Sequence, residues 1–597
     1  MADFGDAAAR KRATDVVAFL RGDVAQLLSH GLVKDFFADA LWDRLPSSWH
    51  TPIDELAADF GALAALLHRP DVGDAASWPL SLRAFVAAAH ALRLPGQLDA
   101  RGEAPAEGGA GAAAPRARAD AYGRCAEQRH VATALRSSIK PKKMHEIVRL
   151  SELSDRVASE AGCDVIVDVG SGQGYLSRAL AFERNWEVVA IEMAADNVRE
   201  AARIDGKVER QLRKQLEAGR WQPGVGSLRH VAATLPPDIS EEGFLRTCGL
   251  LLEPDDGDEG GTAGEGAEGG GGVGRHGCRG ATALVGLHTC GDLAPTCLRV
   301  FDSAGGAVRA LVNVGCCYHH VTAEGDEGDG SEEGEGAGGD DGEEGESGGA
   351  PALSCAPCEA PANYPMSAFV GSLGLRASFH VREMACHSAS AYAERLERAA
   401  ADEAAGAAGA AGAAGAVVDG AGGASNGAAG GAAGGAAGGA AGGAATGEAQ
   451  KLRLHCARAV LEVLLRRSAP AEAVRCARVA GIKRAAEMPF GRYADIAFAA
   501  NGLPPPGGDT ADGRAALEGE MAPLLAQWRR VVAYYVLRQL VAPLWEELLL
   551  LDRLLFLRER GHRASLVPLF DPLLSPRNYA LVASKRADGG GGDGERA

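Results

Sequence analysis

The sequence predicts an α/β protein in which a seven-stranded, doubly wound sheet ends in an antiparallel hairpin. Five short apolar runs between residues 165 and 314 alternate with helical segments, which is typical of βαβ units with a parallel sheet. A glycine-rich turn directly follows the first of these runs. Near the end of the chain, a long helix precedes two more strand-like runs that only a short turn separates. Strands joined without a crossover must pair antiparallel.

The apolar patterns place each predicted element along the chain. Five strands are expected at Val165–Val169, Glu187–Ile191, Ser227–Val231, Ala283–Leu287 and Ala310–Val314. The final helix and the two hairpin strands are expected at Val531–Arg560, Ser565–Asp571 and Asn578–Ser584. Lys140 followed by Pro141 predicts the start of the helix that leads into the first strand, because proline is tolerated in a first turn.

Composition separates a folding part of the chain from low-complexity insertions. Residues 1–100 have a helical pattern and are expected to form an N-terminal module, which would be either a docking surface for a protein partner or a cover for the sheet. A Gly/Ala/Pro linker at 101–115 leads into the α/β domain at 116–597. Acidic or Gly-Ala insertions are expected to interrupt that domain as disordered surface loops, at 253–280, 324–350 and 401–450.

The net charge of −18 belongs to two of these insertions. The tracts Glu253–Gly270 and Glu324–Gly349 hold 7 and 12 acidic residues and no lysine or arginine, so the rest of the chain has a net charge of +1. Overall acidity therefore does not exclude a nucleic-acid partner. The 13 cysteines form no repeating framework, which favours an intracellular, reducing compartment, cytoplasmic or nuclear. No run of about 18 uncharged apolar residues occurs, so no membrane span is expected.

The strongest motif joins the first predicted strand to a glycine-rich turn and a helix, in the sequence Val165-Ile-Val-Asp168-Val-Gly170-Ser171-Gly172-Gln173-Gly174. Glycines let the backbone approach a ligand closely, and the start of the next helix offers N–H groups to an anion. Glu192 ends the second strand, where a carboxylate can accept both hydroxyls of a ribose. Two cofactor classes fit, a dinucleotide and S-adenosylmethionine. The G-x-G-x-G spacing, the preceding Asp168 and the terminal hairpin favour S-adenosylmethionine; a tight turn without ligand is the third alternative.

A second motif, Leu287-His288-Thr-Cys290-Gly-Asp292, follows the fourth strand. Ligands of doubly wound sheets lie beyond the carboxyl ends of the strands, so this motif is expected to face the methyl donor. His288 is the candidate for a base or for a group that aligns the substrate. In the alternative interpretation, His288 and Asp292 only anchor the following helix.

A third motif, Asn313-Val-Gly-Cys316-Cys317-Tyr318-His319-His320, ends the fifth strand. Asn313 and Tyr318 are expected to face the cleft as supporting catalytic groups, while one cysteine packs inside. Cysteine and histidine together suggest zinc, which Cys355 and Cys358 would help to bind. Adjacent cysteine and histidine pairs should not all point at one ion, so no metal site is predicted.

Residues 116–149 form a basic segment with nine Lys/Arg and three Asp/Glu. Lys140, Lys142 and Lys143 stand at the predicted start of a helix and are expected to contact phosphates of a substrate. RNA is therefore a possible partner, although solvent-exposed lysines without a ligand have the same pattern.

Together these motifs resemble the methyltransferase-like protein 25 family, which includes proteins labelled as ribosomal RNA adenine dimethylase domain-containing. The matching stretches include Lys140–Glu146, Asp168–Gly174, Gly286–Leu293, Asn313–His319, Arg382–Ser390 and Val531–Lys585. A weaker similarity connects the His288 and Cys316 motifs to a tRNA ribose 2′-O-methyltransferase family. Adenine dimethylases carry Asn-Leu/Pro-Pro-Tyr/Phe after the fourth strand, where this chain has His288-Thr-Cys-Gly. That departure counts against methylation of a base nitrogen.

The resemblance implies a class I, Rossmann-like methyltransferase fold for 116–597 and S-adenosylmethionine as cofactor. By position, the residues that hold the donor would be Asp168, Gly170, Ser171, Gly172, Gln173, Gly174 and Glu192. The expected activity is methyl transfer to RNA, with His288 aligning or deprotonating the acceptor. The alternatives are a protein or small-molecule methyltransferase, a binding scaffold without turnover, and a nicotinamide oxidoreductase.

Overall fold

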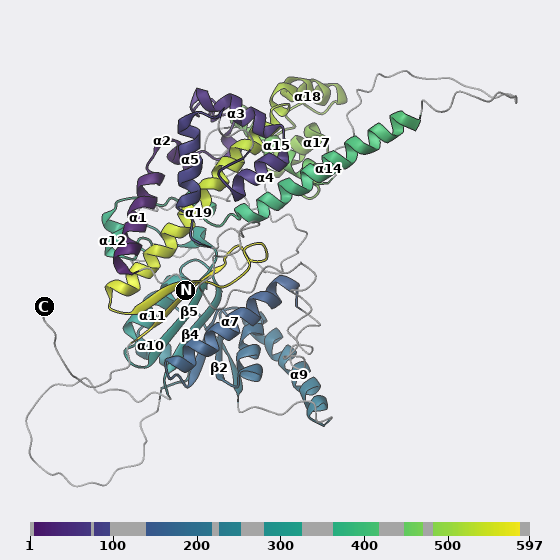
Figure 1. Ribbon diagram of the computed structural model, residues 1–597. Helices are drawn as coiled ribbons and strands as arrows, with labels where there is room; N and C mark the ends of the chain where they lie inside the picture. The colour runs from purple at the N-terminus through teal and green to yellow at the C-terminus, as the bar shows by residue number, and fades with distance from the viewer. Residues whose placement is uncertain are drawn as a thin grey trace, which may run out of the picture.

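The computed structural model describes residues 5–72, 77–95, 139–217, 226–251, 280–324, 362–416, 447–469 and 482–585. It contains a seven-stranded sheet at one end of the molecule and a layer of helices at the other (Figure 1). The strands lie in the order β3-β2-β1-β4-β5-β7-β6. Strands β1 to β5 are parallel neighbours, and β7 inserts antiparallel between β5 and β6. The predicted doubly wound sheet with a terminal antiparallel hairpin is confirmed.

The strand bounds agree with the predicted ranges to within three residues. The strands are β1 (Val165–Val169), β2 (Glu187–Glu192), β3 (Ser227–Ala232), β4 (Thr282–Thr289), β5 (Val308–Gly315), β6 (Arg563–Pro568) and β7 (Tyr579–Ser584). The helices before the sheet are α1 (Asp6–Leu20), α2 (Asp23–His30), η1 (Val33–Asp35), α3 (Ser47–Ala57), α4 (Phe60–His68), α5 (Leu80–Ala91) and α7 (Pro141–Glu160). Pro141 occupies the first turn of α7, as the sequence predicts.

The remaining helices lie between the strands or after β5. Those between the strands are α8 (Tyr175–Arg178), the π-helical turn η3 (Ala179–Glu183), α9 (Ala195–Glu217), α10 (Glu241–Thr247) and α11 (Leu293–Ser303). Those after β5 are η4 (Tyr318–His320), α12 (Ala368–Ser372), α13 (Phe379–Met384), α14 (Ala389–Ala416), α15 (Glu448–Ser468), η5 (Ala485–Glu487), α17 (Phe490–Ala500), α18 (Ala511–Leu525) and α19 (Trp528–Glu559).

Successive residues of β1 pack on opposite faces of the sheet, because side chains alternate along a strand. Val165, Val167 and Val169 join the core that contains α11 and α19. Ile166 joins the core on the other face, which α7 and the α8–η3 segment cover. Asp168 follows the same alternation and faces α8. The sheet therefore separates two hydrophobic cores. Both cores border the edge that is formed by the carboxyl ends of the parallel strands.

Helix α19 is the central helix of the upper layer and runs down to the sheet (Figure 1). Its residues from Val531 to Leu557 are buried except for the half-buried Tyr535. A helix that is buried on all sides must satisfy its polar groups internally. Trp545 donates to the Ser29 hydroxyl at 2.9 Å, and Asp552 accepts from the backbone of Ser367 at 2.9 Å. The helix that the sequence predicts at Val531–Arg560 is confirmed, and the structure shows that it is buried.

The N-terminal helices pack on this same α19. Arg12 of α1 pairs with the buried Glu547, and Arg538 donates to the Leu28 carbonyl of α2 at 3.0 Å. Residues from both ends of the chain therefore build one helical layer. The division of the chain at residue 100 stays a prediction.

The predicted Gly-Ala insertion at 401–450 is wrong at both ends. Helix α14 continues through Ala416, and α15 begins at Glu448. Alanine has the highest helix propensity of all residues, so the alanine-rich start of the tract extends the helix that precedes it. The predicted linker at 101–115, nearly all of the insertions at 253–280 and 324–350, and the middle of 401–450 lie outside the described residues.

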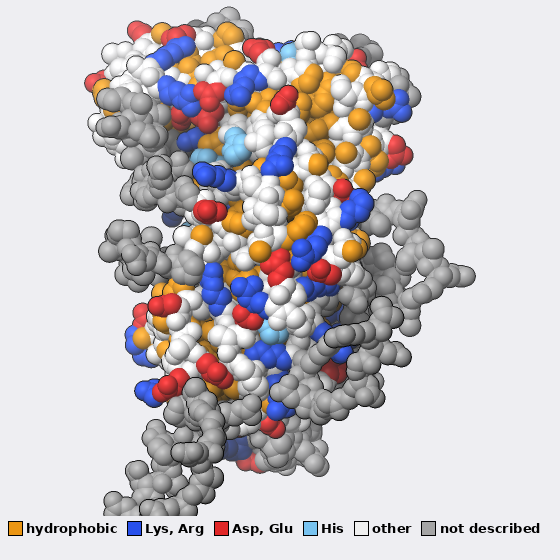
Figure 2. Space-filling view, turned by 90° about the vertical axis from the view of Figure 1, so that its left-hand side faces the viewer, with side chains coloured by type: hydrophobic (Ala, Val, Ile, Leu, Met, Phe, Trp, Pro, Cys, Tyr) orange, Lys and Arg blue, Asp and Glu red, His pale blue; other side chains and the backbone are white. Residues whose placement is uncertain are grey.

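Charged side chains of both signs are interspersed over the face that Figure 2 shows. This agrees with a folding part that is close to neutral once the two acidic tracts are set aside. Within the described ranges, no helix combines the length and the apolar character needed to cross a membrane.

Candidate functional site

The glycine-rich turn after β1 has the backbone conformation that only glycine adopts freely. Gly170, Gly172 and Gly174 have φ values of 72°, 55° and 73°. The amides of Gly170 and Ser171 donate to the Ile191 carbonyl of β2 at 2.9 and 3.0 Å, which folds the turn over the end of β2. The three glycines differ in their surroundings. A Cβ atom added to Gly174 would lie 2.8 Å from Cε1 of His230, whereas one added to Gly172 would meet nothing within 4 Å.

Glu192 lies directly across from this turn. Its Oε2 accepts a hydrogen bond from the Gly172 amide at 2.9 Å, and its Oε1 accepts one from the Ala194 amide at 2.9 Å. The Ser171 hydroxyl is buried and has no hydrogen-bond partner among the described residues. An unsatisfied hydroxyl, a carboxylate and open space beside a glycine fit the ribose and amino-acid parts of S-adenosylmethionine. Gln173, also in the turn, is half-buried.

Asp168 is correctly placed next to the turn, but its carboxylate faces the protein interior. It is 1% exposed, and its Oδ2 accepts from the Ser177 hydroxyl at 2.6 Å. Burial raises its pKa to about 6, against the opposing effect of the Ser177 hydrogen bond. The expectation that Asp168 itself holds the donor is therefore corrected: the carboxylate fixes the first turn of α8 against β1, because alternation along the strand turns it away from the cleft.

Arg178 stabilises the glycine turn from the protein interior. The sequence analysis did not identify it. Its side chain is fully buried and donates to the Gln173 carbonyl at 2.7 Å and to the Ala201 carbonyl at 2.7 Å. It also forms an ion pair with Asp205. The Oδ2 atom of Asp205 lies 2.8 Å from Nε2 of His230. The network connects α8, α9 and β3 beneath the glycines. An arginine on the inward side of a predicted helix was the available signal.

His288 stands at a bulge near the end of β4, with a φ of 60°. Its Nε2 lies 3.0 Å from Oε2 of Glu146 on α7, and the other carboxylate oxygen of Glu146 accepts from the Ser575 hydroxyl at 2.6 Å. The Glu146 side chain is 2% exposed, whereas that of His288 is 37% exposed. A buried carboxylate therefore fixes one ring nitrogen of an imidazole that solvent and substrate can reach. This is the arrangement of an oriented base.

Electrostatics favour an ionised Glu146. Burial opposes its ionisation, but the hydrogen bond from His288, the charge of His288 and the bond from Ser575 outweigh burial and hold the pKa of Glu146 below its usual value. The sequence analysis missed Glu146 and Ser575 as functional residues. Glu146 repeats at helical spacing with the inward-facing Leu150, and an acid at such a position was the signal. Nothing in the sequence around Ser575 distinguishes it.

Asn313 lies on β5 and is 2% exposed. Its Oδ1 accepts from the Thr289 hydroxyl at 3.2 Å, and its Nδ2 has no partner among the described side chains. A Cβ atom added to Gly286 on β4 would lie 3.3 Å from that Nδ2 and 3.5 Å from the Val169 carbonyl. The Asn313 amide therefore reaches across β4 toward the end of β1. It stays a candidate for a polar group beside the donor.

Tyr318 does not face the cleft, so its predicted role as a catalytic group is wrong. The side chain is 1% exposed, and its hydroxyl lies 3.4 Å from Oε1 of Glu546 on α19. Burial raises its pKa well above the usual range. The chain turns into η4 directly after Cys317, and this carries the ring away from the sheet edge into the core beneath α19. His288, Asn313 and Tyr318 are therefore not gathered around one point.

The three lysines expected to contact phosphates are exposed at the start of α7. They lie one to two turns from Glu146 on the same helix, so they share the sheet edge with His288. Lys143 carries its ammonium over the Tyr175 ring, 4.6 Å from the ring centroid. Lys140 and Lys142 are exposed as well.

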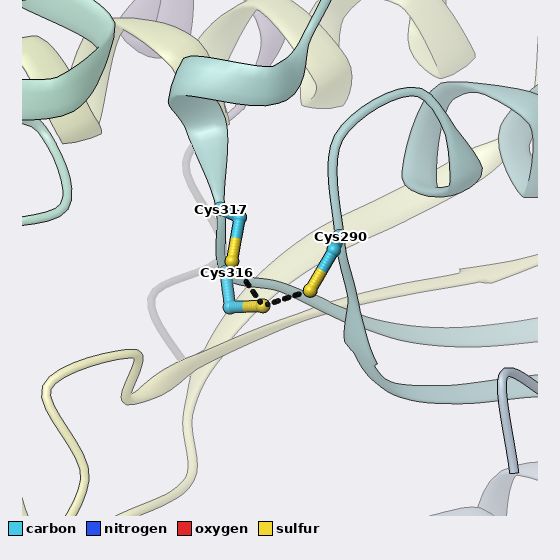
Figure 3. A group of neighbouring side chains, drawn as sticks. All are labelled: Cys290, Cys316 and Cys317. Carbon is cyan, nitrogen blue, oxygen red and sulfur yellow. Dashed lines mark hydrogen bonds between the residues drawn. The ribbon is translucent and has the colours of Figure 1, made fainter. Parts of the chain in front are cut away.

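Three cysteine thiols converge at the same edge (Figure 3). The Sγ atoms of Cys290 and Cys316 are 3.0 Å apart, and those of Cys316 and Cys317 are 3.5 Å apart. The sequence analysis expected that the adjacent cysteine and histidine pairs would not all point at one ion, and His319 and His320 indeed do not belong to the cluster. Cys316 and Cys317 do both belong to it, because β5 ends at Gly315 and the chain bends at Cys317, so strand alternation no longer applies. Cys355 and Cys358 lie outside the described residues.

Comparisons with known proteins support a methyltransferase. A family described as a methyltransferase domain matches residues 142–324, which include β1 to β5, the glycine turn, His288 and the three cysteines. A probable methyltransferase-like protein 25 of Mus musculus is 58% identical over 41 residues, and that of Homo sapiens is 54% identical over 41 residues. Each match covers 7% of this chain and 7% of the relative. No solved structure matches the chain significantly.

Strands β1 to β5 of the sheet lie within the matched residues, whereas β6 and β7 follow later in the chain. Residues 142–324 therefore form a methyltransferase domain, and the matches confirm the resemblance of the chain to the methyltransferase-like protein 25 family.

Proposed function

We propose that this protein transfers a methyl group from S-adenosylmethionine to RNA. The observation that carries the cofactor assignment is the hydrogen bond between Glu192 and Gly172, which places the terminal carboxylate of β2 over the glycine turn of β1. Ser171, Gly172 and Glu192 would hold the donor. When bound, S-adenosylmethionine supplies an electrophilic methyl group on a sulfonium centre.

The chain itself must place and deprotonate the acceptor. Glu146 holds His288 by one ring nitrogen, so the other nitrogen is available to an acceptor hydroxyl or amine. A base positioned in this way contributes about 10² to 10⁴-fold to a rate. Alignment of the two reacting groups contributes further, because a direct displacement depends on their geometry.

RNA is favoured as the acceptor by the position of the basic start of α7. Lys140 and Lys142 are exposed and precede Glu146 by one to two helical turns. Phosphates bound there would bring a nucleic-acid backbone close to His288. Phosphate contacts of this kind position a substrate without reading its sequence.

The experiment that tests the proposal has two parts. Calorimetric titration of the full chain with S-adenosylmethionine, and separately with NADH, should give binding of the first and no heat from the second. Radiolabelled S-adenosylmethionine should then label an RNA fraction rather than a protein fraction. Binding of NADH, or of neither compound, would contradict the cofactor assignment.

The acceptor class is tested separately with charge variants. Lys140→Glu combined with Lys142→Glu should weaken RNA binding and reduce its dependence on salt, because fewer counterions are released. Lys11→Glu is the matched control, since Lys11 is an exposed lysine on α1, far along the chain from the site. Equal RNA affinity for the two variants, or labelling of protein or small molecules alone, would favour a protein or small-molecule methyltransferase.

A further inference from the structure

We propose that the thiols of Cys290, Cys316 and Cys317 bind one Zn²⁺ ion at the carboxyl ends of β4 and β5, with a fourth coordination position open. The proposal does not depend on the identity of the methyl acceptor. Soft thiolate ligands select zinc over the hard cations magnesium and calcium. Binding converts the thiols to thiolates and releases their protons to the solvent.

The spacing of the sulfur atoms suits one ion. The three Sγ atoms all lie within 4.8 Å of one another, and the two closest pairs are 3.0 and 3.5 Å apart. Zinc–thiolate bonds of about 2.3 Å in a tetrahedral site hold their sulfur atoms a little under 4 Å apart. Shifts of less than 1 Å in these two pairs would therefore form the site.

The backbone holds the three residues in place before any ion binds. The Tyr318 amide donates to the Cys316 carbonyl at 3.1 Å, and Cys317 has φ −88° and ψ 75°. These values describe an inverse γ-turn, and the thiols of the adjacent Cys316 and Cys317 lie 3.5 Å apart at this turn. Cys290 comes from a different segment, the loop that follows β4 (Figure 3).

A glycine brings these two segments together. The Gly291 amide donates to the Cys317 carbonyl at 3.2 Å, and a Cβ atom added to Gly291 would lie 2.7 Å from the His320 carbonyl oxygen. Only glycine allows so close an approach, and its φ of 54° also favours glycine. The loop after β4 is thus locked against the turn after β5, with the thiols between them.

Charge near the cluster favours an anionic metal centre. Three thiolates on a divalent ion leave one net negative charge. Two guanidinium groups, those of Arg553 and Arg577, lie over the Tyr318 ring at 5.3 and 5.8 Å from its centroid. Both residues are buried, and Tyr318 directly follows Cys317. Arg577 is already paired with the buried Glu546 at 3.0 Å, so compensation for the charge of the metal centre would come from Arg553.

The open position is accessible. Cys290 is exposed, so an ion can enter from the solvent, and the cluster shares its sheet edge with His288. Zinc sites with three protein ligands keep the fourth position for water or a substrate atom. A disulfide between Cys290 and Cys316 is the competing use of these thiols, but it would leave Cys317 without a role.

The test is a titration of the full chain, reduced and stripped of metal with a chelator, with Co²⁺ and then with Zn²⁺. Co²⁺ should produce a sulfur-to-cobalt charge-transfer band of the intensity expected for three thiolates, at one ion per chain, and Zn²⁺ should displace it. Cys290→Ala should weaken Zn²⁺ binding by more than about tenfold. The loss of a residue that only hydrogen-bonds to a metal ligand already weakens binding by about 10- to 100-fold, and Cys290 would be a ligand itself. Circular dichroism should show that this exposed substitution leaves the fold intact.

Two control variants separate this site from other cysteines. Cys297→Ala removes a buried cysteine of α11 that is outside the cluster, and it should retain wild-type affinity. The double variant Cys355→Ala, Cys358→Ala should also retain it. The proposal is overturned by absence of the thiolate band, by equal affinity in Cys290→Ala, or by loss of binding in the double variant. A Cys290–Cys316 disulfide that persists when the freshly purified chain is supplied with Zn²⁺ would also overturn it.

Discussion

The Nε2 atom of His288 lies 3.0 Å from Oε2 of Glu146, although 142 residues separate the two in the chain. Helix α7 packs over β4 and β5, and this packing brings its buried carboxylate to the end of β4. A second bond from Ser575 fixes the same carboxylate from the loop before β7. Three distant segments thus determine the orientation of one imidazole at the sheet edge.

Glu146→Gln should lower the rate of methyl transfer while leaving the affinity for S-adenosylmethionine unchanged. The pKa of Glu146 is held below its usual value, so the carboxylate is charged at neutral pH. Glutamine can still meet Nε2 of His288 but carries no charge, so it should hold the imidazole less firmly in place. His288→Ala should lower the rate by about 10² to 10⁴-fold, and Glu146→Gln by less.

The matched control for Glu146 is Glu160→Gln, which changes an exposed acid at the other end of α7. It should leave both the rate and the affinity for S-adenosylmethionine as in the wild type. A merely structural role for Glu146 would appear as a lower melting temperature together with weaker binding of S-adenosylmethionine, and that result would contradict its role as a positioning residue.

Gly172→Ala should abolish binding of S-adenosylmethionine, while its cost in stability should be limited to backbone strain. Its φ is 55°, so alanine adds about 1 to 2 kcal/mol of strain, but the new Cβ meets no protein atom within 4 Å. The methyl group would instead occupy the space proposed for the donor. Calorimetry and thermal denaturation of the same samples measure the two effects separately.

Two other glycines calibrate this result. Gly502→Ala carries the same type of strain at φ 67°, also with no atom within 4 Å, and should leave donor binding unchanged. Gly174→Ala should be the least stable of the three variants, because its Cβ would lie 2.8 Å from the His230 ring. Normal donor affinity in Gly172→Ala would show that the donor does not approach this turn.

Asp168→Asn should gain stability relative to the wild type as the pH rises from about 4 to 7. Burial raises the pKa of Asp168 from 3.8 to about 6. Because the pKa is raised in the folded state, the contribution of Asp168 to the free energy of unfolding of the wild type is complete below the pKa of the unfolded chain. That contribution is lost as the pH rises through the pKa of the folded state. Asparagine retains an oxygen that accepts from Ser177 and never ionises.

The raised pKa of Asp168 corresponds to a change on the order of 2 to 3 kcal/mol in the stability of Asp168→Asn relative to the wild type between pH 4 and pH 7. Melting temperatures of both proteins across the range measure it. Asp238→Asn, which changes an exposed aspartate, is the matched control. A constant difference between Asp168→Asn and the wild type would mean that Asp168 stays ionised in the fold.

Tyr318→Phe should leave methyl transfer within about twofold of the wild type and cost about 1 kcal/mol of stability. The hydroxyl is buried against Glu546 and does not reach the sheet edge. Chemical denaturation and the transfer assay measure the two quantities. A large loss of rate with unchanged stability would restore Tyr318 to the catalytic groups.

Local sequence was sufficient for the elements and for the glycine turn. The apolar runs at Val165–Val169 and Tyr579–Ser584 are short and bounded, and the missing crossover before the last strand dictates antiparallel pairing. The alanine-rich extension of α14 was missed because low-complexity composition concealed a strong helix propensity. In the site, Gly172 and Glu192 follow from strand order, since adjacent parallel strands end at one edge.

The sequence by itself determined the fold class, the glycine turn and the position of Glu192, because these depend on periodicity and on neighbouring strands. Only the tertiary structure decided that Asp168 faces Ser177, that Tyr318 is buried under α19, and that three thiols meet. It alone paired Glu146 with His288. Such contacts depend on how helices pack across the sheet and on a bend after β5, and a linear pattern of residues contains neither.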